Sequence, residues 1–343
     1  MSEPIDIKTK KTIPQNNSAK FDKSLVLDSL EQNILTHWET WGKFQQAWVS
    51  TAYKTFNDLE KYIVMIYLIR NYWQNLSDKF KCLSMDEFYD QSNITIDKIN
   101  LIQISNELNI PKETIRRKVN ELQDANVLFR EGKSITFNKA GIDFQKPKET
   151  IELLSAFIEK KSKMLQGYEW FGESWPKEKI KEFIKKYFTV FWLRFFKLQI
   201  PFLIRHRDVF TDLETWIVWG NIAVSHQYHL AKNKEDEILQ DKSINPISLA
   251  NYYNSVVSVK MKRGINASSI SDISSIPRAT VIRKLKWLVK QGCISKTKNL
   301  EYVMVSKGKM NNKIASNFLL NQNYVAEFLT DIFDLMKNSN FKI

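Results

Sequence analysis

Glycine, cysteine and histidine are scarce in this 343-residue sequence, and each scarcity excludes a class of protein. Nine glycines fall well below the usual ~7% of residues, and no glycine-rich loop for a nucleotide phosphate occurs. Gly167 and Gly172 have the spacing of such a loop, but the lysine that binds phosphate does not follow them. The two cysteines, Cys82 and Cys293, cannot build a disulfide framework or a cysteine-rich zinc site. Cys293 opens a predicted strand, where we expect a buried apolar side chain.

Patterns for catalysis and metal binding are also missing. Of the four histidines, His226 and His229 lie three residues apart on a predicted helix, a spacing that can hold a metal ion. No cysteine or acidic ligand accompanies them, so we interpret both as ordinary polar surface residues. No nucleophile elbow and no HExxH motif occurs. We therefore predict that the protein is not an enzyme and binds no metal and no cofactor.

No segment predicts a signal peptide or a membrane span. Residues 1–20 are polar and basic, and we predict a disordered tail there. Residues 187–204 are rich in Phe and Leu but contain Arg194 and Lys197, and each central charge would cost ~2.5–3.5 kcal/mol in a bilayer. We interpret this stretch as a buried amphipathic helix that ends near Pro201. These features predict a cytoplasmic protein.

Three blocks of sequence occur twice in the same order, which indicates an internal duplication. In the first block six of nine positions are identical. The offset between the copies grows from 154 to 166 residues, and an exposed polar loop over 232–242 explains part of that growth. We infer two homologous halves, 21–147 and 148–343. The repeated blocks are 56–64 with 210–218, 83–89 with 247–253, and 110–119 with 276–285.

Acidic residues recur at one position of the repeat. Asp58 in the first half and Asp212 in the second each precede a leucine at the start of an apolar run. Acids favour the positive end of a helix dipole. We therefore interpret both as helix N-terminal residues without a catalytic role.

Each half then contains two short predicted helices joined by a tight turn. The second helix follows Pro111 or Pro277, and its apolar residues have helical spacing. A shorter helix precedes it, over 101–108 in the first half and 267–273 in the second. Because only two or three residues separate the two helices, the pattern predicts a helix-turn-helix in each half.

A strand, a polar turn and another strand follow each predicted helix pair. The motif Ile-Pro-basic-x-Thr-β-branched-x-Arg-Lys-apolar, followed by this hairpin, resembles winged helix-turn-helix regulators of the MarR and IclR kind. The resemblance covers about forty residues in each half and implies DNA binding. Asn126 stands where the second half has Gly292, and Asn also tolerates the left-handed cap. The predicted strands are 127–130, 134–137, 293–296 and 300–305.

We therefore predict a mainly α fold with two tandem winged helix-turn-helix units, each a three-helix core with a small β-wing. An aromatic-rich helical subdomain precedes each unit. Aromatic residues at helical spacing indicate a core, and a small-molecule effector site between the halves is the alternative. The expected order is the tail over 1–20, a helical subdomain over 21–98, a winged helix over 99–147, a helical subdomain over 148–245, a winged helix over 246–309, and C-terminal helices over 310–343.

The net charge of +13 is concentrated in the second predicted winged helix. Residues 260–309 contain twelve basic and two acidic residues, a balance of +10. Residues 101–141 contain seven basic and five acidic residues, a balance of +2. Because phosphate neutralisation supplies most non-specific affinity for nucleic acid, this distribution favours DNA over a protein partner.

DNA contacts are expected from the second helix and the wing of each unit. Arg278 lies at a helix N-terminus, where side chains reach base edges in the major groove. Lysines of the wing are expected to follow the phosphate backbone or the minor groove. The predicted DNA-binding residues are Lys112, Thr114, Arg116, Arg117, Asn120, Arg130 and Lys133 in the first unit, and Arg278, Ala279, Thr280, Arg283, Lys286, Lys296 and Lys298 in the second.

The function predicted from these features is a sequence-specific, double-stranded DNA-binding transcription regulator with two recognition helices in one chain. The chain acts either as a pseudo-dimeric monomer that reads two unlike half-sites or as a homodimer with four units. A replication-initiation or partition protein with tandem winged helices is one alternative. A winged-helix module for protein–protein assembly is another, which the basic residues Arg278, Arg283 and Lys286 disfavour.

Overall fold

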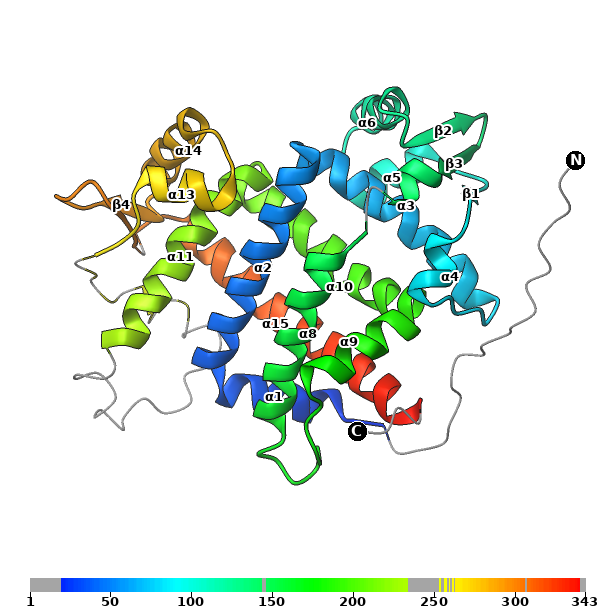
Figure 1. Cartoon of the computed structure of the whole chain (residues 1–343). Coiled ribbons are helices and arrows are strands. Elements are labelled where there is room, and N and C mark those ends of the chain that lie inside the picture. Colours follow the sequence, from blue (N-terminus) through cyan, green and yellow to red (C-terminus); the bar gives the residue numbers. More distant parts are fainter. Residues whose placement is uncertain are drawn as a thin grey trace, which may run out of the picture.

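The structure is a computed structural model that is mainly α-helical, with two small antiparallel β-sheets (Figure 1). This coarser form of the predicted fold class is confirmed. The predicted tail and most of the polar loop over 232–242 lie outside the residues that the structure describes, and so does most of the second copy of the block 83–89. The described residues are 20–143, 146–233, 263–305 and 307–339, with Tyr253, Val256, Val257, Val259 and Met261 between them.

The elements follow one another in two similar series. The first is α1 (Lys23–Gln32), α2 (Ile34–Phe56), α3 (Leu59–Asp78), α4 (Met85–Tyr89), β1 (Asn93–Ile96), α5 (Leu101–Leu108), α6 (Lys112–Asp124), β2 (Leu128–Glu131), β3 (Ser134–Asn138), α7 (Lys139–Asp143) and α8 (Lys148–Leu165). The second is α9 (Lys177–Lys186), α10 (Phe188–Phe210), α11 (Leu213–Asn233), α13 (Ala267–Ser274), α14 (Arg278–Lys290), β4 (Ile294–Lys296), β5 (Tyr302–Met304) and α15 (Met310–Asn338).

Helices of the two series interleave in one shared core. By the offset of the repeat, α1, α2 and α3 correspond to α9, α10 and α11, and the long helix α8 takes the place of α15. The packing is reciprocal: α3 packs on α10 while α11 packs on α2, and α15 packs on α1 while α8 packs on α9. A twofold axis relates contacts of this kind. The two helical segments thus form one layered body (Figure 1).

Side-chain contacts locate the pseudo-twofold axis between α2 and α10. Gln45 and Gln199 are equivalent at the offset of 154, and the Gln45 amide Nε2 donates to the Gln199 Oε1 over 3.2 Å. A residue that touches its own counterpart must lie on the axis. Around this point the rings of Trp48 and Phe195 lie 5.3 Å apart. The reciprocal pair, Trp41 and Phe202, lies 5.7 Å apart.

The two repeated aspartates cap the N-termini of core helices α3 and α11. Asp58 accepts a hydrogen bond from the backbone N–H of Lys61 over 3.0 Å, and Asp212 accepts one from Thr215 over 2.7 Å. Each cap satisfies a backbone donor that the first turn of a helix leaves without a partner. The prediction that these acids begin helices is confirmed.

Helix α10 runs through the middle of the core and does not end near Pro201, as the sequence predicted. It continues to Phe210, because Phe202, Leu203 and Phe210 are buried. Burial of such side chains contributes ~1.5–3 kcal/mol each, which offsets the ~3 kcal/mol cost of an internal proline. Among the described residues no single helix is long and apolar enough to cross a membrane. The pair α9 and α10 meets the test of length and composition only together, with a bend of 103° between them.

The two sheets are small and belong to the two predicted winged units. In the first sheet the order is β1-β3-β2, with every neighbour antiparallel. In the second sheet β4 pairs with β5, and Ile265 adds a single antiparallel bridge to Tyr302. Strands β4 and β5 lie within the predicted bounds, and β2 and β3 each end one residue beyond theirs. Strand β1 was not predicted, because its four residues form no run long enough to show alternation.

Candidate nucleic-acid interface

Each half presents two short helices joined by a three-residue turn, as the sequence predicted. The turn after α5 begins at Asn109 with φ 49°, and the turn after α13 begins at Ser275 with φ 61°, so both use the left-handed region. A serine of the first helix fastens each turn. Ser105 Oγ donates to the carbonyl oxygen of Ile110 over 2.6 Å, and Ser271 Oγ donates to that of Ile276 over 2.7 Å.

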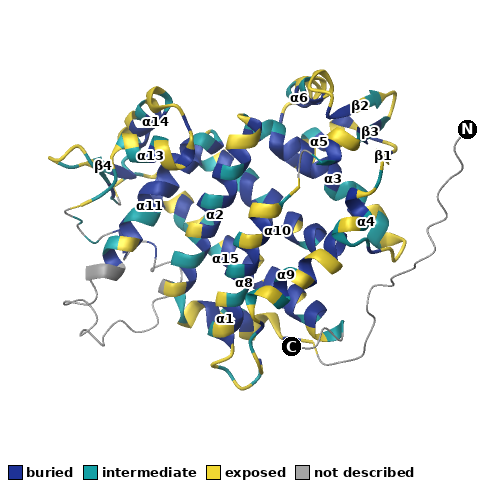
Figure 2. Cartoon of the chain, viewed as in Figure 1, coloured by how far each residue is buried: buried dark blue, intermediate teal, exposed yellow. Residues whose placement is uncertain are grey.

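The inner faces of α6 and α14 carry the expected apolar stripe. Residues at positions i, i+4 and i+7 are fully buried in both helices. Pro111 and Pro277 stand at the N-cap, so their missing N–H groups leave no helical bond unmade. The residues on the opposite side of both helices are mostly exposed (Figure 2). The buried residues are Ile115, Val119 and Leu122 in α6, and Val281, Leu285 and Leu288 in α14.

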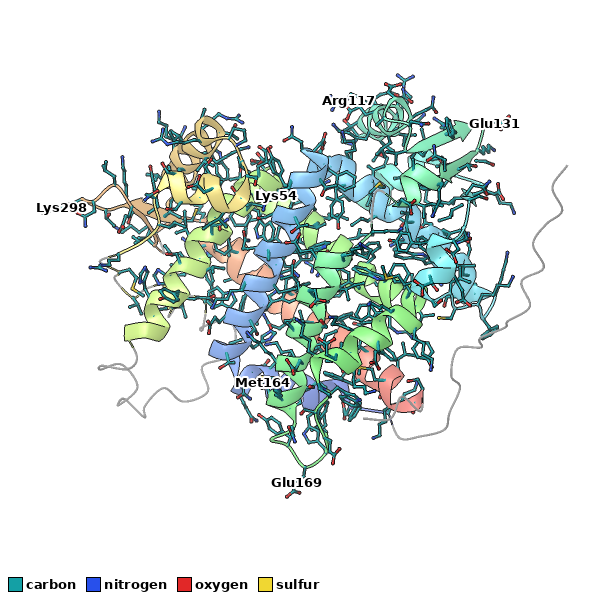
Figure 3. The ribbon with its side chains drawn as sticks, in the orientation of Figure 1. Lys54, Arg117, Glu131, Met164, Glu169 and Lys298 are labelled. Atoms are coloured by element: carbon teal, nitrogen blue, oxygen red, sulfur yellow. The ribbon has the colours of Figure 1, made fainter. Side chains whose placement is uncertain are left out.

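Helices α6 and α14, one from each half, both lie along the upper edge of the molecule as drawn, well apart from each other (Figure 1). Their hairpins point away from each other towards the two ends of that face. The loop between α8 and α9 lies at the opposite side of the molecule, where Met164 and Glu169 are labelled (Figure 3). Both units are therefore presented in one direction.

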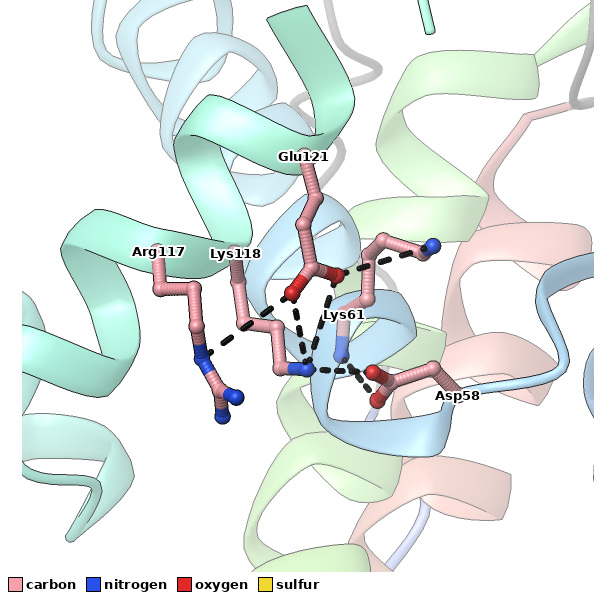
Figure 4. Close-up of polar contacts among 5 residues, drawn as sticks. All are labelled: Asp58, Lys61, Arg117, Lys118 and Glu121. Atoms are coloured by element: carbon pink, nitrogen blue, oxygen red, sulfur yellow. Dashed lines mark hydrogen bonds and ion pairs between the residues drawn. The ribbon is translucent and has the colours of Figure 1, made fainter. Parts of the chain in front are cut away.

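One lysine of each outer helix points inward and joins the unit to the core. Lys118 of α6 is buried and ion-paired with Asp58 at the start of α3, and Glu121 lies 3.4 Å from its ammonium group (Figure 4). In the second half Lys284 makes the equivalent ion pair with Asp212 over 2.5 Å. These two lysines contribute to the charge balance of the sequence but not to the exposed face. The motif Arg-Lys, with its second residue on the apolar side, is the signal that identifies them.

The exposed face of α6 is basic, but acids of the same helix compensate its arginines. Arg116 lies 2.6 Å from Glu113, and Arg117 lies 3.9 Å from Glu121. Lys112 and Asn120 are also exposed, and Thr114 is half-buried. In the hairpin Lys133 is exposed and Arg130 half-buried, and the exposed Glu131 lies at the outer end of β2 (Figure 3). The predicted residues of the first unit thus share one face of low net charge.

The exposed face of α14 carries cations without an acidic partner among the described residues. Arg278, Arg283 and Lys286 are exposed, and none of them forms an ion pair with a described residue. Ala279 is exposed beside them, and Thr280 is half-buried. Arg278 Nε donates to Ser268 Oγ of α13 over 3.1 Å, which orients its guanidinium group at the helix N-terminus.

A groove separates the exposed side of α14 from the hairpin β4–β5. Arg278 and Lys286 line one wall, and Lys296 with Leu300 lines the other. Lys298 lies at the outer end of the hairpin (Figure 3). The structure therefore brings three of the predicted cations, Arg278, Lys286 and Lys296, together on one concave surface, which sequence spacing alone could not establish. Arg283 is exposed on α14 but does not line this groove.

Two residues considered for other chemistry lie in the core. Cys293 is fully buried, as predicted, and burial raises the pKa of its thiol to about 12. His226 is buried too, so its interpretation as a surface residue is wrong. It shares a hydrogen bond of 3.0 Å with the carbonyl oxygen of Val256, which packs over α11. Among the described residues no group of three or more His, Cys, Asp or Glu side chains is placed to hold a metal ion.

The chain matches no protein-family model, no curated protein and no solved structure.

Proposed function

We propose that the protein is a sequence-specific, double-stranded DNA-binding transcription regulator. In this proposal α5, α6 and β1–β3 form one winged helix-turn-helix unit, and α13, α14, β4 and β5 form the other. The observation that carries the proposal is the exposed face of α14 and its hairpin. There Arg278, Arg283, Lys286, Lys296 and Lys298 gather with no ion-paired acid among the described residues.

The arrangement of these cations suits a DNA duplex. An α-helix fits the major groove, and residues at its N-terminus reach base edges. Arg278 stands there and can donate two hydrogen bonds to a guanine, a contact worth ~1–3 kcal/mol of discrimination. Arg283 and Lys286, further along the helix, face the phosphates, while Lys296 and Lys298 extend the contact along the backbone.

The pseudo-twofold relation supports a monomer that reads two half-sites. Because α6 and α14 come from halves related by this axis and lie on one face, one duplex can meet both helices (Figure 1). A twofold-related pair of readers matches an inverted repeat, and the two halves differ in sequence, so the half-sites are expected to differ.

The two units contribute unequally in this proposal. The second unit supplies most of the electrostatic affinity, because its cations have no acidic partner among the described residues. In the first unit Arg116 and Arg117 must leave Glu113 and Glu121 before they can bind phosphate, which lowers the gain in free energy. That unit then contributes selectivity more than affinity.

Selection of bound duplexes from a random pool by the full-length protein tests the proposal. We expect one asymmetric inverted site, bound by one chain. Iterated direct repeats would favour the replication-initiation or partition role, and no enriched sequence at all would refute DNA recognition.

Variants locate the contact. Replacement of Arg278 and Arg283 by Ala is expected to abolish specific binding and flatten the salt dependence of the affinity. The matched control replaces Lys160 and Lys163, two exposed lysines of α8 at the far side of the molecule. It removes the same charge and should bind like the parent. Equal loss in both variants would show that net charge, and not this face, binds DNA.

A further inference from the structure

Two cavities in the helical core are related by the pseudo-twofold axis. The first lies in the region of Trp48, Tyr62 and Trp192, and the second at the equivalent residues Phe202, Trp216 and Trp38. Large apolar residues in the first cavity are replaced by small or polar residues in the second, at an offset of 154. Ile66, Ile69 and Trp73 of the first cavity correspond to Gly220, Ala223 and Gln227 of the second. Phe196, which comes from the second half but lines the first cavity, corresponds to Gly42.

Buried amides line this second, polar cavity. Gln45, Gln227 and Gln322 are 2%, 7% and 1% exposed, and each has an amide atom with no hydrogen-bond partner among the described residues. The indole Nε1 of Trp219, which also lines the cavity, has no hydrogen-bond partner in the described part of the chain either. A buried polar group without a partner costs about 1–3 kcal/mol. Several such groups around one space indicate a site for a molecule that offers both donors and acceptors.

The chemistry of the walls restricts the charge and shape of that molecule. Among the residues that the structure describes, no Asp, Glu, Lys or Arg lines the polar cavity. Its one histidine, His206, stays neutral because burial lowers its pKa to about 3. A charged group would enter without a counter-ion, at a high cost in free energy. Aromatic rings supply the apolar surface of the cavity. The ring centroid of Phe202 lies 5.7 Å from that of Trp41 and 5.4 Å from that of Trp216.

The polar cavity can be reached from the surface. It has a volume of about 60 Å³ and shares Gln46 and Val224 with an open groove of about 480 Å³ between α2 and α11. Gln46 closes the passage, since its amide occupies the space above Gly220, and it accepts a hydrogen bond from Asn221 over 3.3 Å. The closed cavity is smaller than a six-membered ring needs, so a ring enters only when this side chain rotates and joins the cavity to the groove.

We propose that the polar cavity binds a small, uncharged, planar ring that carries amide-type carbonyl and N–H groups. The ring stacks among the tryptophans, its carbonyl oxygens accept from the amides of Gln227 and Gln322, and its N–H donates to Gln45. Any further part of the molecule lies in the groove beside α2. This site does not depend on the proposed DNA-binding function.

Calorimetric titration of the full-length protein with a panel of small molecules tests this site. Uracil and nicotinamide represent the proposed class, benzoate and benzylamine represent charged rings of similar size, and toluene represents an apolar ring. We expect one of the first two to bind with a stoichiometry of one and to quench tryptophan fluorescence. The other three should bind at least tenfold more weakly. The proposal would be overturned if neither uracil nor nicotinamide bound at millimolar concentration, or if a charged or apolar ring bound more strongly than they do.

Variants then place the bound probe in the polar cavity. Gln227→Leu removes one hydrogen-bond donor at nearly constant side-chain volume. It should lower the affinity for the probe about tenfold, the effect of one lost hydrogen bond. Gly220→Ala should weaken it as well, because Gly220 lines the cavity and the added Cβ takes up space there, 1.8 Å from the present position of Gln46 Nε2. Trp73→Phe changes the equivalent position of the first cavity and should leave binding unchanged. Unaltered affinity in both cavity variants, with circular dichroism like the parent, would refute the assignment.

Discussion

Lys118 and Asp58 form a buried ion pair that fastens the outer helix α6 to the first turn of the core helix α3 (Figure 4). Asp58 caps α3 at the same time. Although burial raises the pKa of Asp58, the hydrogen bonds from Lys118 and from the Lys61 N–H outweigh that effect and hold the pKa below its ordinary value. The same relationship recurs as Lys284 with Asp212, so the link between outer helix and core is part of the repeat.

Removal of the buried lysine is expected to destabilise the protein. Lys118→Met leaves the Asp58 carboxylate without its partner and should lower the free energy of unfolding by about 1–3 kcal/mol. The double variant with Asp58→Asn keeps a capping side chain and should recover part of the loss. Urea unfolding measures all three. Lys284→Met should cost less, because its partner Asp212 is 41% exposed against 26% for Asp58. A Lys118→Met variant as stable as an exposed-site control, Arg116→Met, would contradict this account.

Acid is expected to weaken the fold through its buried histidines. Burial lowers the pKa of His206 to about 3, and burial also lowers the pKa of His37 and His226. Above pH 6.5 both folded and unfolded states are neutral at these sites, so stability does not change. Below pH 6.5 the unfolded chain takes up protons that the folded chain resists, so stability falls with pH at all three sites. His206 alone removes about 1.4 kcal/mol per pH unit between its unfolded and folded pKa values.

The variant His206→Phe isolates one of these contributions. Between pH 7 and pH 5 its free energy of unfolding should fall by about 2 kcal/mol less than that of the parent. Denaturant unfolding at the two pH values gives this difference directly, whatever the substitution does to stability at pH 7. Identical pH dependence in parent and variant would show that His206 is protonated in the folded state.

The acids of α6 are expected to restrain DNA binding by the first unit. Glu113→Gln frees Arg116, whose guanidinium lies 2.6 Å from the Glu113 carboxylate. We expect the affinity for the selected site to rise roughly two- to fivefold, with a steeper salt dependence. The control Glu169→Gln removes the same charge at the far side of the molecule (Figure 3). An equal rise in both variants would assign the effect to net charge alone.

Gly292 is expected to tolerate no side chain. Its φ is 72°, and an added Cβ would lie 3.1 Å from the backbone N of Gly308. Gly292→Ala should therefore lower the melting temperature and cost about 1–2 kcal/mol. Gly132→Ala is the matched control, because its φ is 58° but nothing lies within 4 Å of the added Cβ. A larger loss at Gly132 than at Gly292 would show that the contact with Gly308 does not matter.

Local signals made the helix pairs and hairpins predictable from the sequence. Pro111, Pro277 and the left-handed residue after each outer helix act over a few positions, so the predicted bounds agree with the structure to within one or two residues. Burial of Cys293 was predicted from its place at the start of a predicted strand, and in the structure it directly precedes β4. The prediction that a helix ends near Pro201 was wrong for the opposite reason. The local cost of this proline is offset by core contacts that the neighbouring sequence does not reveal.

The interleaving of the halves and the polar cavity depend on contacts between distant residues. Gln45, Gln227 and Gln322 come from three helices, and each alone resembles an ordinary polar residue on an amphipathic helix. A signal was nevertheless present in the repeat. At corresponding positions Trp73 aligns with Gln227 and Ile66 with Gly220, an exchange that a purely structural core position rarely accepts.

The contact between Gln45 and Gln199 has a consequence for inheritance. In an assembly of two identical chains, one codon specifies both residues that meet at the axis. Every substitution there therefore changes both partners, and the new side chain must pack against a copy of itself. Here two codons specify the two glutamines, and each can mutate while the other is retained. The fusion of the halves therefore lets each half change independently, which is the condition under which one half can gain charge while the other does not.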